Sequence, residues 1–435
     1  MRVVVLVDGE HHPAAVRAAL DALRSRGDEI VGAVFCGGTE KVDLTRLDEA
    51  YGVPVTRGEH LTAVLEEAIA SWKGEAILDL TDHPVLTAAE RFRLAATALH
   101  RGVPYRGADF DLRPPAFEHV LTKPSIRVFA TGKRTGKTAV ASALARHAVQ
   151  RGHRPVIVAV GRGGPNPPRV IEAGAALDAR VLLELADEGL HAGSDYVEDA
   201  LTSGVATIGC VRVGGGLAGA TVYSNVPEAA RIAERREEDL VILEGSGASL
   251  PDVAADVGVM CVPADIEAGE LEGYLGAYRL LLADLAVVTM AEEASSAATT
   301  EAAIHGTVPD LDVVHVAFRP EPLGSISGRR VFVCTTAPVG AGALLTQHLE
   351  QVYGCEVVGL TDRLSDRSVL AGELEGAPPY DVLLTEIKAA AVDVAVRHAL
   401  GADKEVVFMN NAAVGSGLEE AFDRVIEKAI DRAVR

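Results

Sequence analysis

The sequence predicts an α/β protein: a central domain with a mainly parallel sheet, flanked by a smaller N-terminal α/β domain and a C-terminal α/β domain. Short apolar runs rich in Val and Ile alternate with helical patterns, as expected for parallel strands covered on both faces. The chain has 435 residues, more than one hydrophobic core usually serves. A strand, a turn of Gly, Lys and Thr, and an Ala-rich helix follow one another at 126–140. We place the domains at 1–120, 121–325 and 326–435.

The N-terminal domain contains short apolar runs that end in polar clusters. The runs occupy residues 3–7, 30–35 and 76–80, and a helical pattern fills 13–26. Asp8 and His11 follow the first run, where open α/β sheets bind ligands. Metal ligands, solvated loop residues and substrate contacts all remain open for these clusters, although the His spacing fits no standard metal-ligand set. Substrate contact is the hypothesis kept for Asp8 and His11, and Arg106 is the favoured anion contact of this domain.

The motif at 126–140, IRVFATGKRTGKTAV, is close to the P-loop pattern G-x-x-x-x-G-K-[ST], with Thr131 where the first Gly belongs. Such a turn directs backbone N–H groups at one point beside a helix N-terminus and so binds nucleotide phosphates. Lys137 is expected to reach the β and γ phosphates, and the Thr138 hydroxyl to coordinate Mg²⁺. The central domain is therefore predicted to be a P-loop NTPase core. The expected ATP contacts are Gly132, Lys133, Arg134, Thr135, Gly136, Lys137, Thr138 and Ala139.

Two other strand ends in the central domain combine an arginine with glycines. The strand at 155–160 runs into GRGGPNPP, and the strand at 205–211 runs into RVGGGLAG. Glycine lets backbone N–H groups approach a ligand closely, and arginine makes bidentate contacts with phosphate. These loops predict a small, multiply phosphorylated substrate, with a merely flexible surface loop as the alternative for the first. The expected substrate contacts are Arg162, Gly163, Gly164, Arg212, Gly215 and Gly216. Between the loops, Ser194 or Asp195 is expected to cap a helix.

The aliphatic strand at 240–243 ends in Glu244, which would place a carboxylate across from the P-loop. We expect Glu244 to hold Mg²⁺ together with Thr138, or to orient the attacking group. A plain acid at a strand end is the alternative. The later segment 289–292, TMAE, lacks the Lys and Asp that recognise guanine in N/T-K-x-D motifs. This absence favours ATP over GTP.

The C-terminal domain repeats the alternation of strands and helices. Its apolar runs occupy residues 331–335, 357–360, 382–385 and 406–409. Residues 334–342 look like a phosphate loop but have no Lys, so we interpret them as a turn or a weak anion contact. Lys388 follows the third run and is a candidate side chain near the active site.

The composition argues against several partners and compartments. Forty-one basic and 62 acidic residues give a formal net charge of −21, which repels nucleic acid and anionic membranes. The most apolar stretch, 275–288, is interrupted by charges and is too short to span a bilayer. The N-terminal apolar run is too short for a secretory signal, and the five cysteines form no C-x-x-C pair. We expect a cytoplasmic protein with reduced thiols that binds neither nucleic acid nor membranes.

The ordered motifs resemble those of one family over almost the whole chain. VDGEHHP, FATGKRTGKTAV, GRGGPNPP, GSDYVEDAL, RVGGGLAG and VILEGSGAS follow one another in the order seen in cyclic 2,3-diphosphoglycerate synthetases. The resemblance implies an ATP-dependent ligase that closes 2,3-diphosphoglycerate through an intramolecular phosphoanhydride and releases ADP and phosphate. Our hypothesis is that Lys137 and Arg134 neutralise the transferring phosphoryl group, that Thr138 and Glu244 hold Mg²⁺, and that Arg106, Arg162 and Arg212 hold the substrate phosphates. We also expect a homodimer.

Two other functions remain open at this point. The EGSG step also resembles the EGAG of dethiobiotin and cobyrinic-acid synthetases, which would imply a ligase that activates a carboxylate. Such an enzyme needs an apolar substrate pocket, which the aromatic content of 4% does not favour. A P-loop switch that makes no product should instead hydrolyse ATP slowly, with no stimulation by a phosphorylated small molecule.

Overall fold

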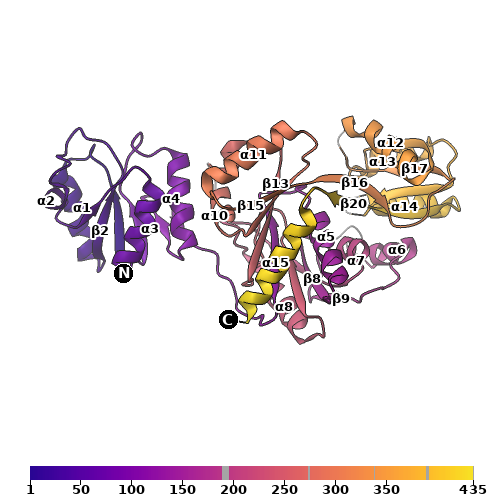
Figure 1. The fold of residues 1–435 in the computed structure, drawn as a ribbon, viewed down its shortest axis with the longest axis horizontal. Helices are drawn as coiled ribbons and strands as arrows, with labels where there is room; N and C mark the ends of the chain where they lie inside the picture. The colour runs from indigo at the N-terminus through magenta and orange to yellow at the C-terminus, as the bar shows by residue number, and fades with distance from the viewer. Residues whose placement is uncertain (189–194, 273–274, 338, 388–390, 435) are drawn as a thin grey trace.

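The computed structural model describes residues 1–188, 195–272, 275–337, 339–387 and 391–434. It forms three α/β units along the long axis of the molecule, each with a mainly parallel sheet (Figure 1). The predicted fold class is therefore confirmed. Within the described ranges, no helix is both long enough and apolar enough to cross a membrane.

The N-terminal unit has a six-stranded sheet in the order β3-β2-β1-β4-β5-β6. The strands are β1 (Arg2–Val7), β2 (Glu29–Phe35), β3 (Val55–Thr56), β4 (Ala76–Asp79), β5 (Tyr105–Arg106) and β6 (Asp111–Leu112). The helices are α1 (Pro13–Ser25), α2 (Leu47–Tyr51), α3 (Leu61–Trp72) and α4 (Ala88–His100). All neighbouring strands are parallel except β5 and β6. The strand order reverses between β1 and β4, so the loops after these two strands meet at the switch point of the sheet.

The central unit is built on a nine-stranded sheet in the order β11-β10-β8-β12-β7-β13-β14-β15, with β9 also paired to β10. Its strands are β7 (Ser125–Ala130), β8 (Pro155–Gly161), β9 (Arg169–Ile171), β10 (Ala206–Val213), β11 (Tyr223–Ser224), β12 (Leu240–Glu244), β13 (Val257–Pro263), β14 (Leu285–Thr289) and β15 (Asp312–His315). Its helices are α5 (Lys137–Gln150), α6 (Ala179–Asp187), α7 (Asp195–Ser203), α8 (Val226–Arg235), α9 (Ala268–Leu271), α10 (Gly276–Leu281) and α11 (Ala294–Thr307). The strands from β10 to β15 along this order are all parallel.

Strands β7 and β8 are buried along their whole length, which explains their continuous apolar sequence. Side chains of a strand alternate between the two faces of the sheet. Ile126 and Val128 pack on the face that α5 covers, whereas Phe129 packs in the core on the other face. The turn between β7 and α5 is therefore carried by a strand that the core holds from both sides.

The C-terminal unit has a five-stranded sheet in the order β16-β20-β19-β17-β18. Its elements are β16 (Ala317–Pro322), β17 (Arg330–Cys334), η1 (Val339–Ala341), α12 (Gly342–Tyr353), β18 (Glu356–Thr361), α13 (Arg367–Glu375), β19 (Val382–Glu386), α14 (Val392–Gly401), β20 (Glu405–Val414) and α15 (Leu418–Ala433). Figure 1 shows α15, in yellow, lying back across the central sheet. Phe422 and Ile426 of α15 belong to the same core as Ile126 of β7. The predicted C-terminal range, 326–435, thus includes a helix that packs on the central unit and omits the whole of β16.

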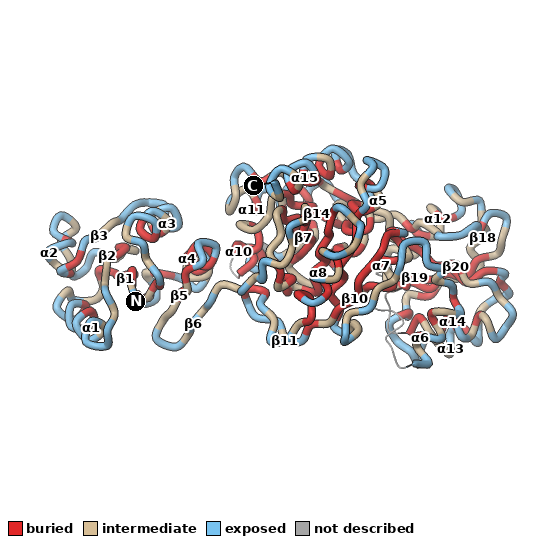
Figure 2. Tube along the Cα trace, turned by 90° about the horizontal axis from the view of Figure 1, so that it is seen from below, coloured by how far each residue is buried: buried red, intermediate tan, exposed pale blue. Residues whose placement is uncertain are grey.

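The N-terminal unit docks on the central unit through α4. This helix begins with a capping box between Thr87 and Glu90. Its buried residues Leu94 and Leu99 lie in one continuous core with Tyr278 and Leu280 of α10. Figure 2 shows this junction between two units that are exposed around their rims. The N-terminal unit is therefore held to the central unit by apolar packing as well as by the linker.

Candidate active site

The turn between β7 and α5 has the shape that its glycines and lysine predict. Gly136 has φ +78°, and a Cβ there would lie 2.1 Å from Cζ of Phe318, so only glycine fits. Lys137 is 7% exposed, and its Nζ donates to the Gly132 carbonyl at 2.7 Å and to Oγ1 of Thr135 at 3.2 Å. Arg134 stands exposed at the tip with φ +57°, a strained conformation often found at functional sites. The lysine ammonium is thus held inside the loop where a phosphate would sit.

The other members of the loop differ in exposure. Lys133 is exposed, and Gly132 and Ala139 are partly buried. Thr135 is buried, and its carbonyl accepts a hydrogen bond from Oγ1 of Thr289 at 3.0 Å. This bond ties the loop to the end of β14. Sequence reasoning gave Thr289 no role in the site, because a threonine at a strand end has no distinctive signal.

Glu244 lies directly across from the start of α5. Oγ1 of Thr138 donates to Oε1 of Glu244 at 2.7 Å, and Glu244 is 1% exposed. Its second oxygen, Oε2, is buried and has no hydrogen-bond partner in the part of the chain that the structure describes. A buried carboxylate oxygen without a donor is costly unless a cation compensates it. Mg²⁺ prefers such a site, with few protein oxygens and the remaining positions filled by water and phosphate.

Arg162 and Arg212 converge on Gly247, in the loop after β12. Gly247 has φ +60°, and a Cβ there would lie 2.4 Å from Nη2 of Arg162 and 3.2 Å from Nη2 of Arg212. Burial and then the charge of Arg162 lower the pKa of Arg212. Two guanidinium groups this close repel each other, so an anion between them would be stabilising. The predicted convergence of two arginines from separate loops is present in the structure.

The two arginines differ in what else they contact. Arg212 is 7% exposed and donates to the carbonyls of Gly214 and Ser246, both at 2.7 Å. Its Nε is buried with no hydrogen-bond partner among the described residues. Arg162 is exposed, and within the same residues it makes no hydrogen bond or ion pair. Arg162 is thus the freer phosphate ligand, whereas Arg212 also shapes its own loop.

The glycines of these loops serve protein packing as much as ligand approach. A Cβ on Gly164 would lie 1.9 Å from the carbonyl oxygen of Cys210, so this glycine lets the loop press against β10. A Cβ on Gly215 would lie 3.1 Å from Oγ of Ser249. Gly216 closes a turn by donating to the Ala220 carbonyl at 2.8 Å, and Gly163 is exposed.

Strand order explains why these loops meet. The strands β10, β8, β12 and β7 are consecutive neighbours in the central sheet, and all four are parallel. Their carboxyl ends therefore share one edge. Arg212 and Glu244 lie at the carboxyl ends of β10 and β12, Arg162 follows the end of β8, and Lys137 begins α5 after the turn that follows β7. This edge is the candidate active site.

The N-terminal candidates are not part of this cluster. Asp8 is 0% exposed, and its carboxylate accepts hydrogen bonds from His11 and from the Asp82 N–H at 2.8 Å. Burial alone would raise the pKa of Asp8, but these bonds lower it overall. Arg106 lies near Asp111, with 3.4 Å between Nε and Oδ1. Figure 1 places this unit at one end of the molecule, away from α5. Asp8 thus anchors a loop of its own unit, and Arg106 pairs with Asp111 in the same unit.

Two predicted features of the C-terminal unit have different outcomes. In the loop after β17, Oγ1 of Thr335 and both the N–H and Oγ1 of Thr336 donate to the Glu386 carboxylate, at 2.6–3.0 Å. A carboxylate thus takes the hydrogen-bond donors that an anion would need, so the turn interpretation holds over a weak anion contact. Lys388 lies outside the described residues.

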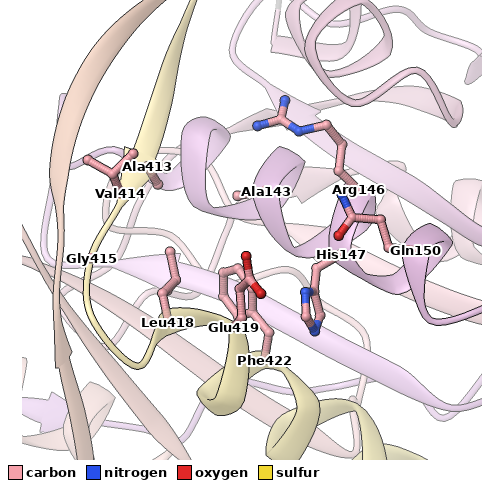
Figure 3. Close-up of a pocket in the computed structure, with 10 residues that line it drawn as sticks. All are labelled: Ala143, Arg146, His147, Gln150, Ala413, Val414, Gly415, Leu418, Glu419 and Phe422. Carbon is pink, nitrogen blue, oxygen red and sulfur yellow. The ribbon is translucent and has the colours of Figure 1, made fainter.

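A cavity of about 340 Å³ lies beside the second half of α5, away from the candidate active site. Figure 3 shows Arg146 and His147 of α5 on one side and Glu419 and Phe422 of α15 on the other. Nε2 of His147 lies 2.7 Å from Oδ1 of Asp423. None of the predicted site residues lines this cavity.

Asp195 and Arg279 lie close to the cluster although sequence reasoning did not assign them to it. A Cβ on Gly161, at the end of β8, would lie 3.2 Å from Oδ2 of Asp195, so this carboxylate stands beside the strand end. Asp195 was expected only as a helix cap, and Arg279 only as a charge that interrupts an apolar stretch. Nothing in the sequence alone places either beside the cluster, because their neighbours are distant in the chain.

Three family models match the chain in succession. They describe the N-terminal domain, the P-loop domain and the C-terminal domain of cyclic 2,3-diphosphoglycerate synthetase, and they match residues 2–113, 125–317 and 322–412. A cyclic 2,3-diphosphoglycerate synthetase of Rubrobacter xylanophilus is 44% identical, over 99% of this chain and 98% of that protein. The chain belongs to the cyclic 2,3-diphosphoglycerate synthetase family. This synthetase is a ligase-type enzyme with a P-loop domain.

Other members of the synthetase family are nearly as similar. The cyclic 2,3-diphosphoglycerate synthetases of Methanothermus fervidus and Thermococcus sibiricus are 39% and 40% identical, and the alignments cover 98–99% of this chain and 97–98% of theirs. Among solved structures, LpxK from Aquifex aeolicus in complex with ATP aligns at 14% identity with a TM-score of 0.42, over 72% of this chain and 90% of that one. The family assignment rests on the sequence matches alone.

Proposed function

We propose that this synthetase uses MgATP to convert 2,3-diphosphoglycerate into cyclic 2,3-diphosphoglycerate, with release of ADP and phosphate. The observation that carries the proposal is the meeting of Arg162 and Arg212 at Gly247, beside the P-loop. Joining two phosphates of one small molecule brings like charges together. The reaction therefore needs cations and N–H donors fixed around the reacting groups.

The proposed reaction has two steps that balance in atoms and charge. The γ-phosphoryl group of ATP passes to one phosphate of the substrate, which forms a mixed anhydride and leaves ADP. An oxygen of the second substrate phosphate then attacks the phosphorus of the first. The anhydride bond to the transferred phosphoryl group breaks, and inorganic phosphate departs.

The residues at the sheet edge have distinct parts in this scheme. Lys137 and Arg134 neutralise the transferring phosphoryl group, the former from within the loop and the latter from its exposed tip. Arg162 and Arg212 hold the substrate phosphates, and Arg162 has the greater freedom to follow them between the two steps. Gly163, Gly164, Gly215 and Gly216 let the loop backbones come close to the substrate.

Thr138 and Glu244 are the residues that would hold Mg²⁺. Oε2 of Glu244 has no hydrogen-bond partner among the residues that the structure describes. This oxygen and the adjacent hydroxyl of Thr138 are hard oxygen ligands of the kind that Mg²⁺ takes. When bound, Mg²⁺ supplies positive charge to the β and γ phosphates of ATP. We also propose that Asp8, His11 and Arg106 contact the substrate. This role requires the N-terminal loops to lie closer to the edge of the central sheet than they do in this structure.

One experiment tests the function. The protein is incubated with MgATP and 2,3-diphosphoglycerate, and the products are followed by phosphorus NMR. We expect a pair of coupled anhydride signals to appear as ADP and phosphate accumulate. Release of ADP and phosphate without that pair would refute the cyclisation. Slow ATP hydrolysis at a rate that 2,3-diphosphoglycerate does not change would favour a P-loop switch. Turnover only with a carboxylate substrate would favour a dethiobiotin-type ligase.

We also propose that the synthetase is a homodimer that works in the cytoplasm. The segment 213–223 contains no charged residue in a chain of net charge −21, and Val222 and Tyr223 within it are 88% and 46% exposed. Two copies can meet there without opposing like charges. We expect light scattering to give the mass of two chains and Val222→Glu to give that of one; a monomeric parent protein would contradict the proposal. Free, buried thiols such as Cys261, whose pKa burial raises to about 12, suit a reducing compartment.

A further inference from the structure

Arg279 of α10 is almost completely buried, and its guanidinium group contacts two loops of the candidate active site. It is 4% exposed. Nε and Nη2 donate to the carbonyl of Ala248 at 3.0 and 2.6 Å, and Nη1 donates to the carbonyls of Leu217 at 3.1 Å and Leu275 at 2.9 Å. All three nitrogens of the planar group are therefore engaged by backbone oxygens.

Two of the carbonyls that Arg279 contacts belong to loops that lie beside the substrate arginines. Ala248 follows Gly247 in the loop after β12, and Leu217 lies in the glycine loop that Arg212 begins. The same loops also meet through a backbone bond from the Leu250 N–H to the Gly219 carbonyl at 2.9 Å. Within the described loops, Arg279 thus adds to a junction that also contains this backbone bond and the hydrogen bond from Arg212 to the Ser246 carbonyl.

The environment of Arg279 is unusual for a cation. Among the described residues, its hydrogen-bond acceptors are all backbone carbonyl oxygens, and it forms no ion pair. Burial lowers its pKa to about 10, so the group stays charged at neutral pH. A buried charge without a counter-ion is destabilising unless backbone dipoles compensate it. An apolar residue would fill the same space at less cost, unless the position serves the fixed geometry of the two loops.

A second buried arginine in the same region provides an internal comparison. Arg127 is 6% exposed, and burial lowers its pKa to about 10 as well. Its Nη2 donates to the Val253 carbonyl at 2.9 Å, and its guanidinium group lies 4.2 Å from the ring centre of Phe117. Val253 lies in the loop after β12, five residues beyond Ala248, and Phe117 lies in the linker. These contacts therefore involve neither the glycine loop after β10 nor the residues beside Gly247. The two arginines therefore match in burial and charge but differ in what they hold.

We propose that Arg279 is a positioning residue for the synthetase reaction. It fixes the glycine loop after β10 against the loop after β12, so that Gly247 keeps the position on which Arg212 and, from the loop after β8, Arg162 converge. The inference rests on the proposed function, because it assumes that these arginines hold the substrate phosphates. It goes further in assigning their relative position to a residue that touches neither substrate nor ATP.

The same arginine connects the site to the N-terminal unit. Its neighbour Tyr278 and the following Leu280 pack in the core that α4 shares. The loops after β10 and β12 are thus connected through Arg279 to α10, the helix against which α4 of the N-terminal unit packs. Loss of the Arg279 contacts should therefore displace the loops at the substrate site. The P-loop should keep its conformation, because Arg279 has no hydrogen bond to it among the described residues.

The test compares Arg279→Met with Arg127→Met in the full chain. For Arg279→Met we expect the KM for 2,3-diphosphoglycerate to rise by about 10- to 100-fold, the effect of misplacing a binding group by about 1 Å. The dissociation constant of MgATP, measured by calorimetry, should stay within about twofold, because the loops that move lie beyond the P-loop. Arg127→Met should lower the melting temperature without changing the KM by more than about twofold.

Two further measurements test the positioning role of Arg279 if Arg279→Met does not fold. Arg279→Lys retains the charge but cannot span two carbonyl groups with a planar fork, so it should raise the substrate KM even when its melting temperature is unchanged. Guanidinium at millimolar concentration should restore part of the activity of Arg279→Gly and should leave the activity of Arg127→Gly unchanged.

The outcomes separate this inference from the proposed function. If the parent enzyme forms the cyclic product but Arg279→Lys has the parent KM and Arg279→Gly is not rescued, the positioning role is wrong and the function stands. If the parent enzyme forms no cyclic product, the proposed function has failed. If the parent enzyme forms the cyclic product and Arg279→Met raises the MgATP dissociation constant as much as the KM, the assignment of these loops to the substrate is wrong.

Discussion

The sharpest test of the cation cluster is the substitution Gly247→Ala. A single methyl group at this position would lie 2.4 Å from Nη2 of Arg162 and 3.2 Å from Nη2 of Arg212. The first distance is far below van der Waals contact, so the Arg162 guanidinium must move away. Because the displaced group is the end of a long side chain, the fold can accommodate the change. The expected effect is therefore on the substrate site.

The magnitude follows from two separate terms. The φ of +60° at Gly247 is unfavourable for alanine by about 1–2 kcal/mol, which affects stability. Loss of one charge-assisted contact between Arg162 and a substrate phosphate weakens binding by about 1.5–3 kcal/mol. At 1.4 kcal/mol for each factor of ten, the substrate KM should rise by about 10- to 100-fold. The affinity for ATP should not change, since Arg162 is not part of the P-loop.

Gly174→Ala is the matched control. Gly174 has φ +70°, and a Cβ there would meet no atom within 4 Å. It therefore reproduces the backbone strain without touching an arginine. Both variants should melt lower than the parent by a few degrees, about 2–4 °C for each kcal/mol in a domain of this size. Only Gly247→Ala should show the higher KM. Equal KM values in the two variants would show that the guanidinium groups near Gly247 do not hold the substrate.

The other predictions concern the P-loop, the metal and the N-terminal loop. Lys137→Ala should abolish turnover with circular dichroism unchanged, and full activity would contradict its role at the phosphates. Glu244→Gln should weaken Mg²⁺-dependent ATP binding by about tenfold or more, measured by calorimetry with and without Mg²⁺; equal losses in both would argue against a metal ligand. Asp8→Asn should destabilise the fold by about 1.5–3 kcal/mol at pH 7. The pKa of Asp8 lies below its usual 3.8, so its contribution is complete above that value and lost as the pH falls through the folded pKa. The melting difference from the parent should vanish there, and a difference constant down to pH 2 would refute the argument.

Local patterns were sufficient to predict the central sheet and the loops at its edge. The strand at 126–130 is fully apolar except for one arginine, and its turn leads into Lys137 and Thr138 at the spacing of the P-loop pattern. The arginine and glycine loops were recognisable because each directly follows a strand. Their meeting at one edge follows from the parallel strand order. Periodicity alone could not give that order, but the P-loop architecture restricts it.

The features that the sequence did not reveal depend on pairs of residues far apart in the chain. Arg279 lies 31 positions from Ala248 and 62 from Leu217, and no local pattern connects them. Asp8 stood where a ligand contact is expected, yet the bond from the Asp82 N–H, 74 positions away, makes it an internal anchor. The return of α15 to the central sheet was also hidden, because an amphipathic helix fits any apolar surface.

A net charge of −21 and a multiply phosphorylated substrate are compatible because electrostatic interactions in water have a short range. At physiological ionic strength, exposed charges farther apart than about 8 Å are largely screened. Two charges 4 Å apart near a protein surface still interact by about 4 kcal/mol. Arg162 and Arg212 at Gly247 therefore outweigh the many distant carboxylates. It follows that substrate affinity depends on where two guanidinium groups stand relative to each other, and hence on the backbone contacts that fix their loops. The composition of a chain cannot carry that information, and a shift of about 1 Å in either loop should matter more than several changes of surface charge.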